Sequence, residues 1–452
     1  MDTNDPNPVS EHQAWFFKRW LFGFLDGHYI DRSACDTAFE RMHRQDAIGD
    51  RIHLLFACLG LVCMFGPVTL TEVAFGPLVV FFFVRVINTF PVWIHGFGQP
   101  VALAAIAIAG WMMLSLRWSG DSFLGWGEIA ELRWFVLVGL IFPVIEHRRA
   151  LITAMCIGIA FGQLGQVADA FDGFGIGWLA QLVENHPNRI AGWWQPVVGG
   201  SILVAGLGLH LPSAMFANGR TRLWGMAGVA SVGVGIIGTG TRGAWIASVL
   251  LIVGAICFGA CTKRMRTKQV IVLVLGALVI SMIAGVMMRE SLGVRVEQAR
   301  LELGQAFDGQ YDSSTGLRVK MGQLAIDATI ANPVAGVGAG GYQTWVDVQD
   351  PDAGVHAHAH NSLLQISSTL GLVGVLFWSV LMLSVIRAAW RIWDVKAEGY
   401  FGLAPLFAIV GLMLASITDS VHINTQTAAM LGALVALCPA YRPKHPIWRS
   451  DK

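Results

Sequence analysis

Long apolar stretches separated by short polar ones constrain this chain more than any other feature. A helix that spans a lipid bilayer needs about 20 mostly apolar residues, and stretches of this kind recur from residue 52 to residue 441. Only 13% of the residues are charged, compared with roughly 25% in soluble globular proteins. Because an open sheet edge cannot be satisfied in lipid, spanning segments must be helices. We therefore predict an all-α polytopic membrane protein.

We predict about twelve transmembrane helices. The fourth is short and the seventh and eighth nearly touch, so eleven or thirteen also fit the pattern. The predicted spans lie near residues 52–70, 73–90, 100–116, 134–146, 150–167, 194–215, 223–240, 242–261, 269–288, 361–386, 402–418 and 425–441.

The basic residues favour this count. Loops on the cytoplasmic side of a membrane carry an excess of Lys and Arg. With the N-terminus inside, the basic residues gather in alternate loops and in the tail: Arg148, Arg149, Arg220, Arg222, Lys263, Arg264, Arg266, Lys268, Arg387, Arg391, Lys396, Arg442, Lys444, Arg449 and Lys452.

This topology divides the chain into three parts. Residues 1–51 form a cytoplasmic segment in which residues 14–25 can lie along the membrane as an interfacial helix or pack on the protein itself. Residues 52–441 form the transmembrane helical domain, and residues 442–452 form a cytoplasmic tail. The largest outside loop, residues 289–360, contains a predicted amphipathic helix over residues 291–307, because Leu292, Val296, Ala299 and Leu303 recur at helical spacing.

Three arginines are candidate anion-binding residues on the outer side. Arg242 lies between two predicted spans in the sequence GTGTRGAW, where Gly240 and Gly243 allow a ligand to approach the backbone closely. Arg318 begins a predicted helix in the large loop, and Arg189 lies where an earlier outside loop returns to the membrane. An arginine at a membrane boundary is commonly an anchor. Three that face one side also suit a lipid-linked diphosphate, because guanidinium groups bind phosphate through paired hydrogen bonds.

Histidines crowd the junction between the large loop and the next predicted span. His356, His358 and His360 alternate, and in an extended segment they would share one face and could bind zinc or copper. Alternatively, a single histidine is functional. His360 is then the candidate, because it adjoins Asn361 and Ser362, which can cap the following helix.

The glycine-rich segment from Gly336 to Gly341, GVGAGG, formally matches a dinucleotide-binding motif. It lacks the strand–turn–helix context that such a site requires. With Asn332 and Pro333 before it, the segment is instead typical of a turn that bends the loop back toward the membrane.

The order of these motifs, TGTRGAW, STGLR, NPVAGVGAGGY and HNSLLQISSTLGLVG, resembles the superfamily of O-antigen ligases and O-antigen polymerases of bacterial envelopes. The resemblance covers roughly residues 187–374. It implies a multi-pass protein of the bacterial inner membrane with its active site facing the periplasm. The implied enzyme is an inverting glycosyltransferase that uses no metal or other cofactor.

By the same resemblance, the donor is a glycan linked to undecaprenyl diphosphate, and the acceptor is a hydroxyl of lipid A–core or of another glycan. Membrane lipid is an expected partner and nucleic acid is not. Arg242, Arg318 and Arg189 would bind the diphosphate, and His360 would be the catalytic base. Asn361, Gly240 and Gly243 would support them.

One position departs from the ligase pattern. His360, Asn361 and Gly371 fit it, but Gly374 stands where the pattern has threonine. Ligase and polymerase therefore both stay open. A lipid or polysaccharide transporter is the more remote alternative. Such proteins usually place ionisable groups inside their spans, and the predicted spans have almost none at mid-membrane.

Overall fold

The computed structural model describes residues 21–172, 189–262, 313–351, 358–393, 399–439 and 441, together with residues 293–294, 297–298, 300–302, 304–305 and 309–311. The secondary-structure elements in this part of the chain are helices, as predicted. The predicted span 269–288, the tail 442–452 and the first twenty residues lie outside it.

Eleven of the described helices precede residue 173. They are α2 (Arg32–Gln45), α3 (Ala47–Cys63), α4 (Val68–Val73), α5 (Gly76–Val84), α6 (Val86–Phe97), α7 (Pro100–Ser115), α8 (Ser122–Glu131), η1 (Leu132–Val136), α9 (Leu137–Ile141), η2 (Phe142–His147) and α10 (Arg148–Asp172). The others are α12 (Pro196–Phe216), α13 (Gly219–Gly238), α14 (Arg242–Cys261), α17 (Ser314–Ala331), α18 (Gly341–Gln349), α19 (Ser362–Trp393), η4 (Gly399–Leu403), α20 (Ala404–Ala415) and α21 (Thr425–Ala436).

Four of these helices are long and apolar enough to cross a membrane. They are α12, α13, α14 and α19, and a bent pair formed by residues 68–84 and 86–97 makes a possible fifth. The helices α7, α20 and α21 are apolar but shorter. The described residues therefore support an all-helical membrane protein, and the full count of twelve spans stays a prediction.

The second predicted span is not one continuous helix. Residues 73–90 include the end of α4, all of α5 and the start of α6, and the chain bends by 113° between residues 68–84 and 86–97, at Arg85. The Arg85 guanidinium binds the carboxylates of Asp46 and Asp50, each at 2.6 Å, and its backbone has left the helical region at φ −98° and ψ 10°. The chain therefore turns where a buried charge has to reach its partners.

The predicted span 134–146 is also broken. It consists of the 3₁₀ segment η1, one short α-helix and the 3₁₀ segment η2. Pro143 lacks a backbone N–H, so it removes a donor from the helical ladder. Val144 leaves helical geometry at φ −116°. The apolar composition of this segment was predicted correctly, but its continuity was not.

The helix α12 lies at the centre of the bundle. In an apolar stretch of 18 residues, 83% of α12 is buried inside the structure, compared with 28% of α13 and 33% of α14. It packs against α13, α20 and α14. A Cβ at Gly208 would lie 2.4 Å from the backbone of Phe407, so glycine permits the close contact with α20.

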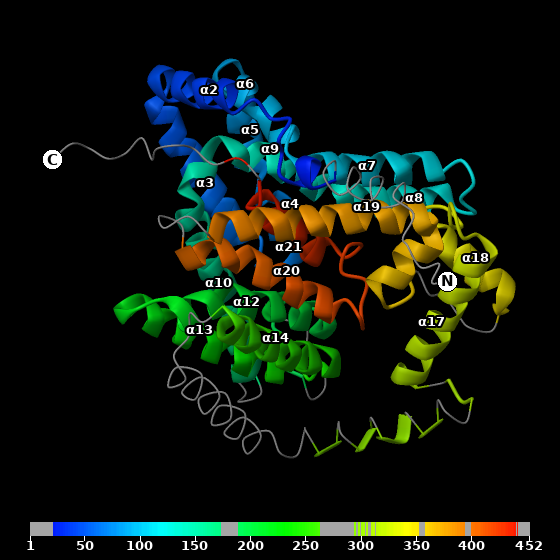
Figure 1. Cartoon of the computed structure of the whole chain (residues 1–452). Helices are drawn as coiled ribbons and strands as arrows, with labels where there is room; N and C mark the ends of the chain where they lie inside the picture. The colour runs from blue at the N-terminus through cyan, green and yellow to red at the C-terminus, as the bar shows by residue number, and fades with distance from the viewer. Residues whose placement is uncertain are drawn as a thin grey trace, which may run out of the picture.

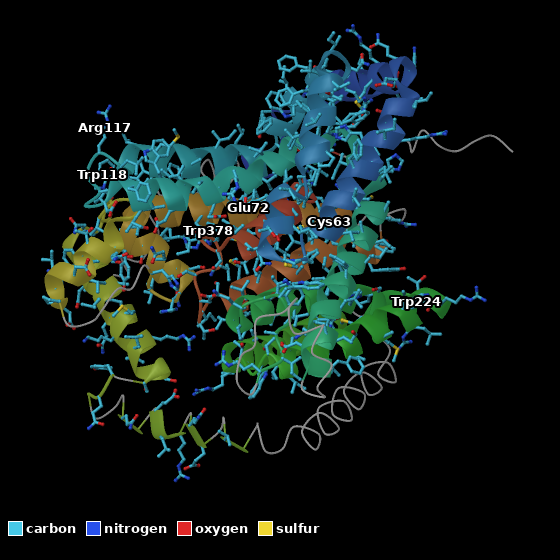
Figure 2. The ribbon with its side chains drawn as sticks, turned by 180° about the vertical axis from the view of Figure 1, so that it is seen from behind. Cys63, Glu72, Arg117, Trp118, Trp224 and Trp378 are labelled. Carbon is cyan, nitrogen blue, oxygen red and sulfur yellow. The ribbon has the colours of Figure 1, made fainter. Side chains whose placement is uncertain are left out.

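The bundle has two distinct ends (Figure 1). The yellow helices α17 and α18 lie at one end, beside the start of α19 and near α8. Figure 2 shows Arg117 and Trp118 at this same end and Trp224, near the start of α13, at the opposite end. The predicted topology assigns these two ends to opposite faces of the membrane.

Candidate active site

The seven predicted site residues line one cavity of about 400 Å³. It lies between the turn that joins α13 to α14, the first turns of α17 and α19, and the segment after α20. The predicted residues on its wall are Arg189, Gly240, Arg242, Gly243, Arg318, His360 and Asn361. They come from segments far apart in the sequence, and the fold brings them together.

The turn from Thr239 to Gly243 places Arg242 at this cavity. The Thr239 hydroxyl accepts the backbone N–H of Thr241 at 3.3 Å. The Thr241 hydroxyl donates to the Pro196 carbonyl at 2.8 Å and so fixes the turn to the start of α12. Arg242 is then the first residue of α14 and lies at the edge of the bundle.

Both glycines of this turn have a structural requirement. Gly240 has a φ of +62°, which favours glycine over residues with a Cβ. Gly243 packs against the loop that follows α20, and a Cβ there would lie 2.0 Å from the Thr418 hydroxyl oxygen. The two glycines therefore allow the turn to approach the other wall of the cavity.

Arg242 holds a carboxylate. Its Nη2 donates to both oxygens of Glu302, at 3.2 and 3.1 Å, and the Thr315 hydroxyl donates to the same carboxylate at 2.5 Å. Burial acts to raise the pKa of Glu302, but the bonds from Arg242 and Thr315 outweigh it and lower that pKa. This geometry demonstrates that Arg242 can bind a planar anion at the cavity.

Arg318 lies one turn into α17. The Ser313 hydroxyl caps this helix by accepting the Gly316 N–H at 3.0 Å, as expected for a serine before a helix. Burial lowers the pKa of Arg318; the carboxylates of Asp419 and Glu302 oppose this effect, and the charge of Arg242 adds to it. The two guanidinium groups are therefore electrostatic neighbours, which suits a ligand with more than one negative charge.

Arg189 is placed by its neighbour Ile190, whose N–H donates to the Gly238 carbonyl at 2.8 Å. The next two residues, Ala191 and Gly192, donate their N–H groups to the Asp169 carboxylate at 2.8 and 2.9 Å. The segment is thus attached to α10 and to the end of α13, and it brings Arg189 to the cavity wall.

His360 has an unusual backbone conformation. Its φ is +51°, the only positive φ of a non-glycine residue in the described part of the chain. The next residue, Asn361, caps α19: its side-chain oxygen accepts the N–H groups of Leu363 and Leu364 at 2.9 and 3.0 Å. Its amide also donates to the Ile417 carbonyl at 3.0 Å. The predicted capping role of Asn361 is confirmed, and it orients the residue before it.

Sequence analysis did not identify Asp419, which lies between α20 and α21 and is 4% exposed. Burial raises its pKa, against the charges of His358 and Arg318. Ligand atoms of His358, His360 and Asp419 lie within 4.8 Å of one another. Two imidazoles and a carboxylate form a donor set that zinc accepts. His356, the third member of the predicted set, lies outside the described residues. A single acidic residue between two apolar stretches was the available signal for Asp419.

The glycine-rich turn has a structural role. Val337 and Gly338 donate their N–H groups to the carbonyls of Ser368 and Thr369 in α19, at 2.8 and 2.9 Å. On its other side, the Ser115 hydroxyl accepts the Ala339 N–H at 3.0 Å. The turn therefore joins α7 to α19, consistent with its interpretation as a turn that leads back to the bundle.

A larger cavity, of about 520 Å³, lies at the other end of α12. It is lined mainly by apolar side chains of α10, α12, α13 and η4. None of the predicted site residues lies there, and the chemistry of its wall does not suit phosphate. The smaller cavity is the candidate active site.

Part of the chain matches a known protein family. Residues 226–379 match the family model described as O-antigen ligase. The match includes Arg242, Arg318 and His360, and Arg189 lies before it. A search of curated proteins found no match. Over residues 226–379 the chain is therefore similar to the O-antigen ligase family.

Proposed function

We propose that this protein is an O-antigen ligase-type glycosyltransferase of the bacterial inner membrane. It transfers a glycan from undecaprenyl diphosphate to a hydroxyl of lipid A–core at the periplasmic face. The observation that carries this proposal is the single cavity that gathers three arginines and His360. Cations and a titratable imidazole at one site suit a donor whose leaving group is an anion.

The arginines act on the donor. A lipid diphosphate is a good leaving group when its charge is stabilised, and guanidinium groups stay protonated while they do so. Arg242 and Arg318 lie close enough to influence each other, and Arg189 lies on the same cavity wall. The diphosphate would take over Arg242 donors that the Glu302 carboxylate holds in this structure.

His360 acts on the acceptor. A sugar hydroxyl is a poor nucleophile at neutral pH, so a base must take its proton as the new bond forms. Neutral imidazole can accept that proton, whereas the arginines cannot. The hydroxyl oxygen attacks the anomeric carbon from the side opposite the diphosphate, and the bond to the diphosphate oxygen breaks. One such displacement inverts the anomeric configuration.

The proposed reaction needs no metal ion. The arginines supply the positive charge that magnesium supplies to phosphate in many other enzymes. His360 cannot hold a metal through its basic nitrogen and accept a proton there at the same time. The cluster of His358, His360 and Asp419 is therefore the specific alternative that a chelator distinguishes.

An O-antigen or exopolysaccharide polymerase is the second candidate, because Gly374 departs from the ligase pattern. A Cβ at Gly374 would lie 2.3 Å from the Leu370 Cβ, so threonine does not fit this backbone unchanged. Gly374 does not line the candidate cavity. The departure therefore does not alter the wall of the candidate cavity.

Deletion of the gene, followed by electrophoresis of lipopolysaccharide, tests the proposal. Loss of ligase activity leaves lipid A–core without polymeric glycan, while long lipid-linked glycan accumulates. Loss of polymerase activity leaves lipid A–core that carries at most one repeat unit. An unchanged banding pattern, with unchanged exopolysaccharide, would contradict both assignments.

A further inference from the structure

Three hydrogen bonds join the glycine-rich turn, α8 and the residue before His360. One oxygen of the Glu128 carboxylate accepts the Gly340 N–H at 3.1 Å. The other accepts the side-chain amide of Gln365 at 3.0 Å. The Gln365 carbonyl oxygen in turn accepts the Ala359 N–H at 2.9 Å. Glu128 is thus connected to the backbone at Ala359 through a single side chain.

The chemistry of the three groups fixes the orientation of Gln365. A backbone N–H can only donate, so Ala359 requires the carbonyl end of the side-chain amide. The NH₂ end then points toward Glu128 and requires an acceptor. The Glu128 carboxylate accepts from both Gln365 and Gly340, and these two bonds act against the burial that raises the pKa of Glu128 to about 7. Gln365 is fully buried, so a donor left unmatched there would be costly.

The backbone of His360 needs support on both sides. A non-glycine residue with a positive φ persists only where the surrounding structure holds it. On the C-terminal side, Asn361 is bound to the Ile417 carbonyl and to the first N–H groups of α19. On the N-terminal side, Ala359 is 2% exposed, and its N–H is held by Gln365.

We propose that Glu128 and Gln365 are positioning residues that hold the His360 imidazole toward the acceptor. This inference rests on the proposed role of His360 as the base. Neither Glu128 nor Gln365 lines the candidate cavity, so neither is a catalytic residue. They act through Ala359, which does line it.

The connection also explains why α8 and the glycine-rich turn belong to the site. The turn binds Glu128 through Gly340, which has a φ of +73°. A Cβ on Gly340 would lie 2.1 Å from the Gly125 nitrogen of α8. Glu128 therefore ties together the turn and the start of α19, two segments that are adjacent to the His360 loop.

An exchange of the two side chains tests this inference. In Glu128→Gln, one amide oxygen faces two donors, so either Gly340 or Gln365 loses its acceptor. In Gln365→Glu, two carboxylates face each other. In the double variant Glu128→Gln/Gln365→Glu, the new amide accepts from Gly340 and donates to the new carboxylate, which still accepts from Ala359. All three hydrogen bonds are restored with donor and acceptor reversed between α8 and α19.

The rate of transfer and the binding of donor are measured on purified full-length protein with a synthetic glycan linked to undecaprenyl diphosphate. We expect each single variant to lower kcat at least about tenfold. Donor affinity should be unchanged, because none of the three arginines takes part in these hydrogen bonds. We expect the exchanged variant to return to within about threefold of wild type. Glu72→Gln is the matched control: Glu72 pairs with Arg133 on an exposed surface, and Figure 2 labels it near the middle of the molecule.

Three results would overturn the inference. The first is that both single variants transfer at the wild-type rate. The second is that they lose donor binding together with kcat, which indicates general damage to the fold. The third is that the exchanged variant stays as slow as the single ones. Failure of the proposed function is distinguished by His360→Ala: if that variant keeps wild-type kcat, His360 is not the base, whatever Glu128 and Gln365 do.

Discussion

At the scale of single residues, the site combines cations that cannot give up their protons with an imidazole that can. Arg242 is hydrogen-bonded to Glu302. Arg318 interacts electrostatically with Asp419, Arg242 and Glu302. A diphosphate entering this cavity would meet positive charge partly balanced by two carboxylates.

Chelation separates the two roles considered for the histidines. Because the arginines can stabilise the leaving diphosphate, we expect purified protein to transfer glycan at an unchanged rate in excess EDTA. The measurement is the initial rate before and after chelator. If EDTA removes activity, zinc restores that activity, and zinc fails to restore it in Asp419→Asn, a metal would be assigned to His358, His360 and Asp419.

Sequence predicted the residues with distinctive neighbours and missed those defined by tertiary contact. Arg242 lies among glycines and threonines, and His360 adjoins a helix cap, so both carry local signals. Glu128 and Glu302 carry none that separates them from other carboxylates, and the only signal at Asp419 is that it is a single acidic residue between two apolar stretches. Their importance arises because the fold places Glu128 beside Gln365, Glu302 beside Arg242, and Asp419 beside two histidines.

At the scale of elements, α19 contains a break in its helical geometry that its apolar sequence does not predict. Gly371 has φ +65° and ψ −165° inside the helix, a region that is essentially restricted to glycine. The N–H of Leu372 then donates to the Pro333 carbonyl at 2.8 Å. The break lets the first part of α19, which follows His360 and carries Gln365, take a different course from the second part, which continues through the bundle.

Gly371→Ala should damage both stability and transfer. The new Cβ would lie 2.3 Å from the Val334 carbonyl oxygen, and the backbone conformation alone costs about 1–3 kcal/mol for a residue other than glycine. Thermal unfolding in detergent and kcat are the measurements. Gly254→Ala on α14 is the control, since its Cβ has nothing within 4 Å. Equal behaviour of the two variants would mean that the break in α19 is not required.

At the scale of the whole molecule, the two ends of the bundle carry different charge networks. At the end opposite the candidate site, the His43 ring contacts Asp50 at 2.5 Å and Glu146 at 3.1 Å, and Arg85 bridges Asp46 and Asp50. Sequence predicted the helical class and the positions of most apolar segments. It could not predict the breaks at Arg85 and Val144, because long-range ion pairs and local backbone geometry decide them.

The His43 network makes stability depend on pH. Burial acts to lower the pKa of His43, but its two carboxylate partners raise it from 6.5 to about 9. The stabilisation is therefore complete below pH 6.5 and is lost as the pH rises through about 9. It amounts to about 3 kcal/mol. We expect the wild-type Tm to fall between pH 6.5 and 9.5, and the fall to be smaller in His43→Gln. An equal fall in both proteins would show that other groups control it.

The topology of the chain is tested by labelling single cysteines from the periplasm in a cysteine-free background. We expect labelling within residues 289–360 and at Arg117→Cys. Residues 262–268 and Trp224→Cys should stay unlabelled until the membrane is permeabilised, because the basic loops favour the cytoplasm. Labelling of Lys263→Cys in intact cells would contradict the arrangement.

The most direct test of the account is glycan transfer by the purified His360→Ala variant. General-base assistance typically contributes about 10²–10⁴-fold, so we expect the variant to fold, to bind the lipid-linked donor as wild type does, and to transfer roughly a hundredfold or more slowly. Arg242→Ala and Arg318→Ala should instead lose donor binding as well as turnover. A wild-type rate in His360→Ala with an inactive His358→Ala would move the base to His358. Wild-type rates in both histidine variants would contradict the account altogether.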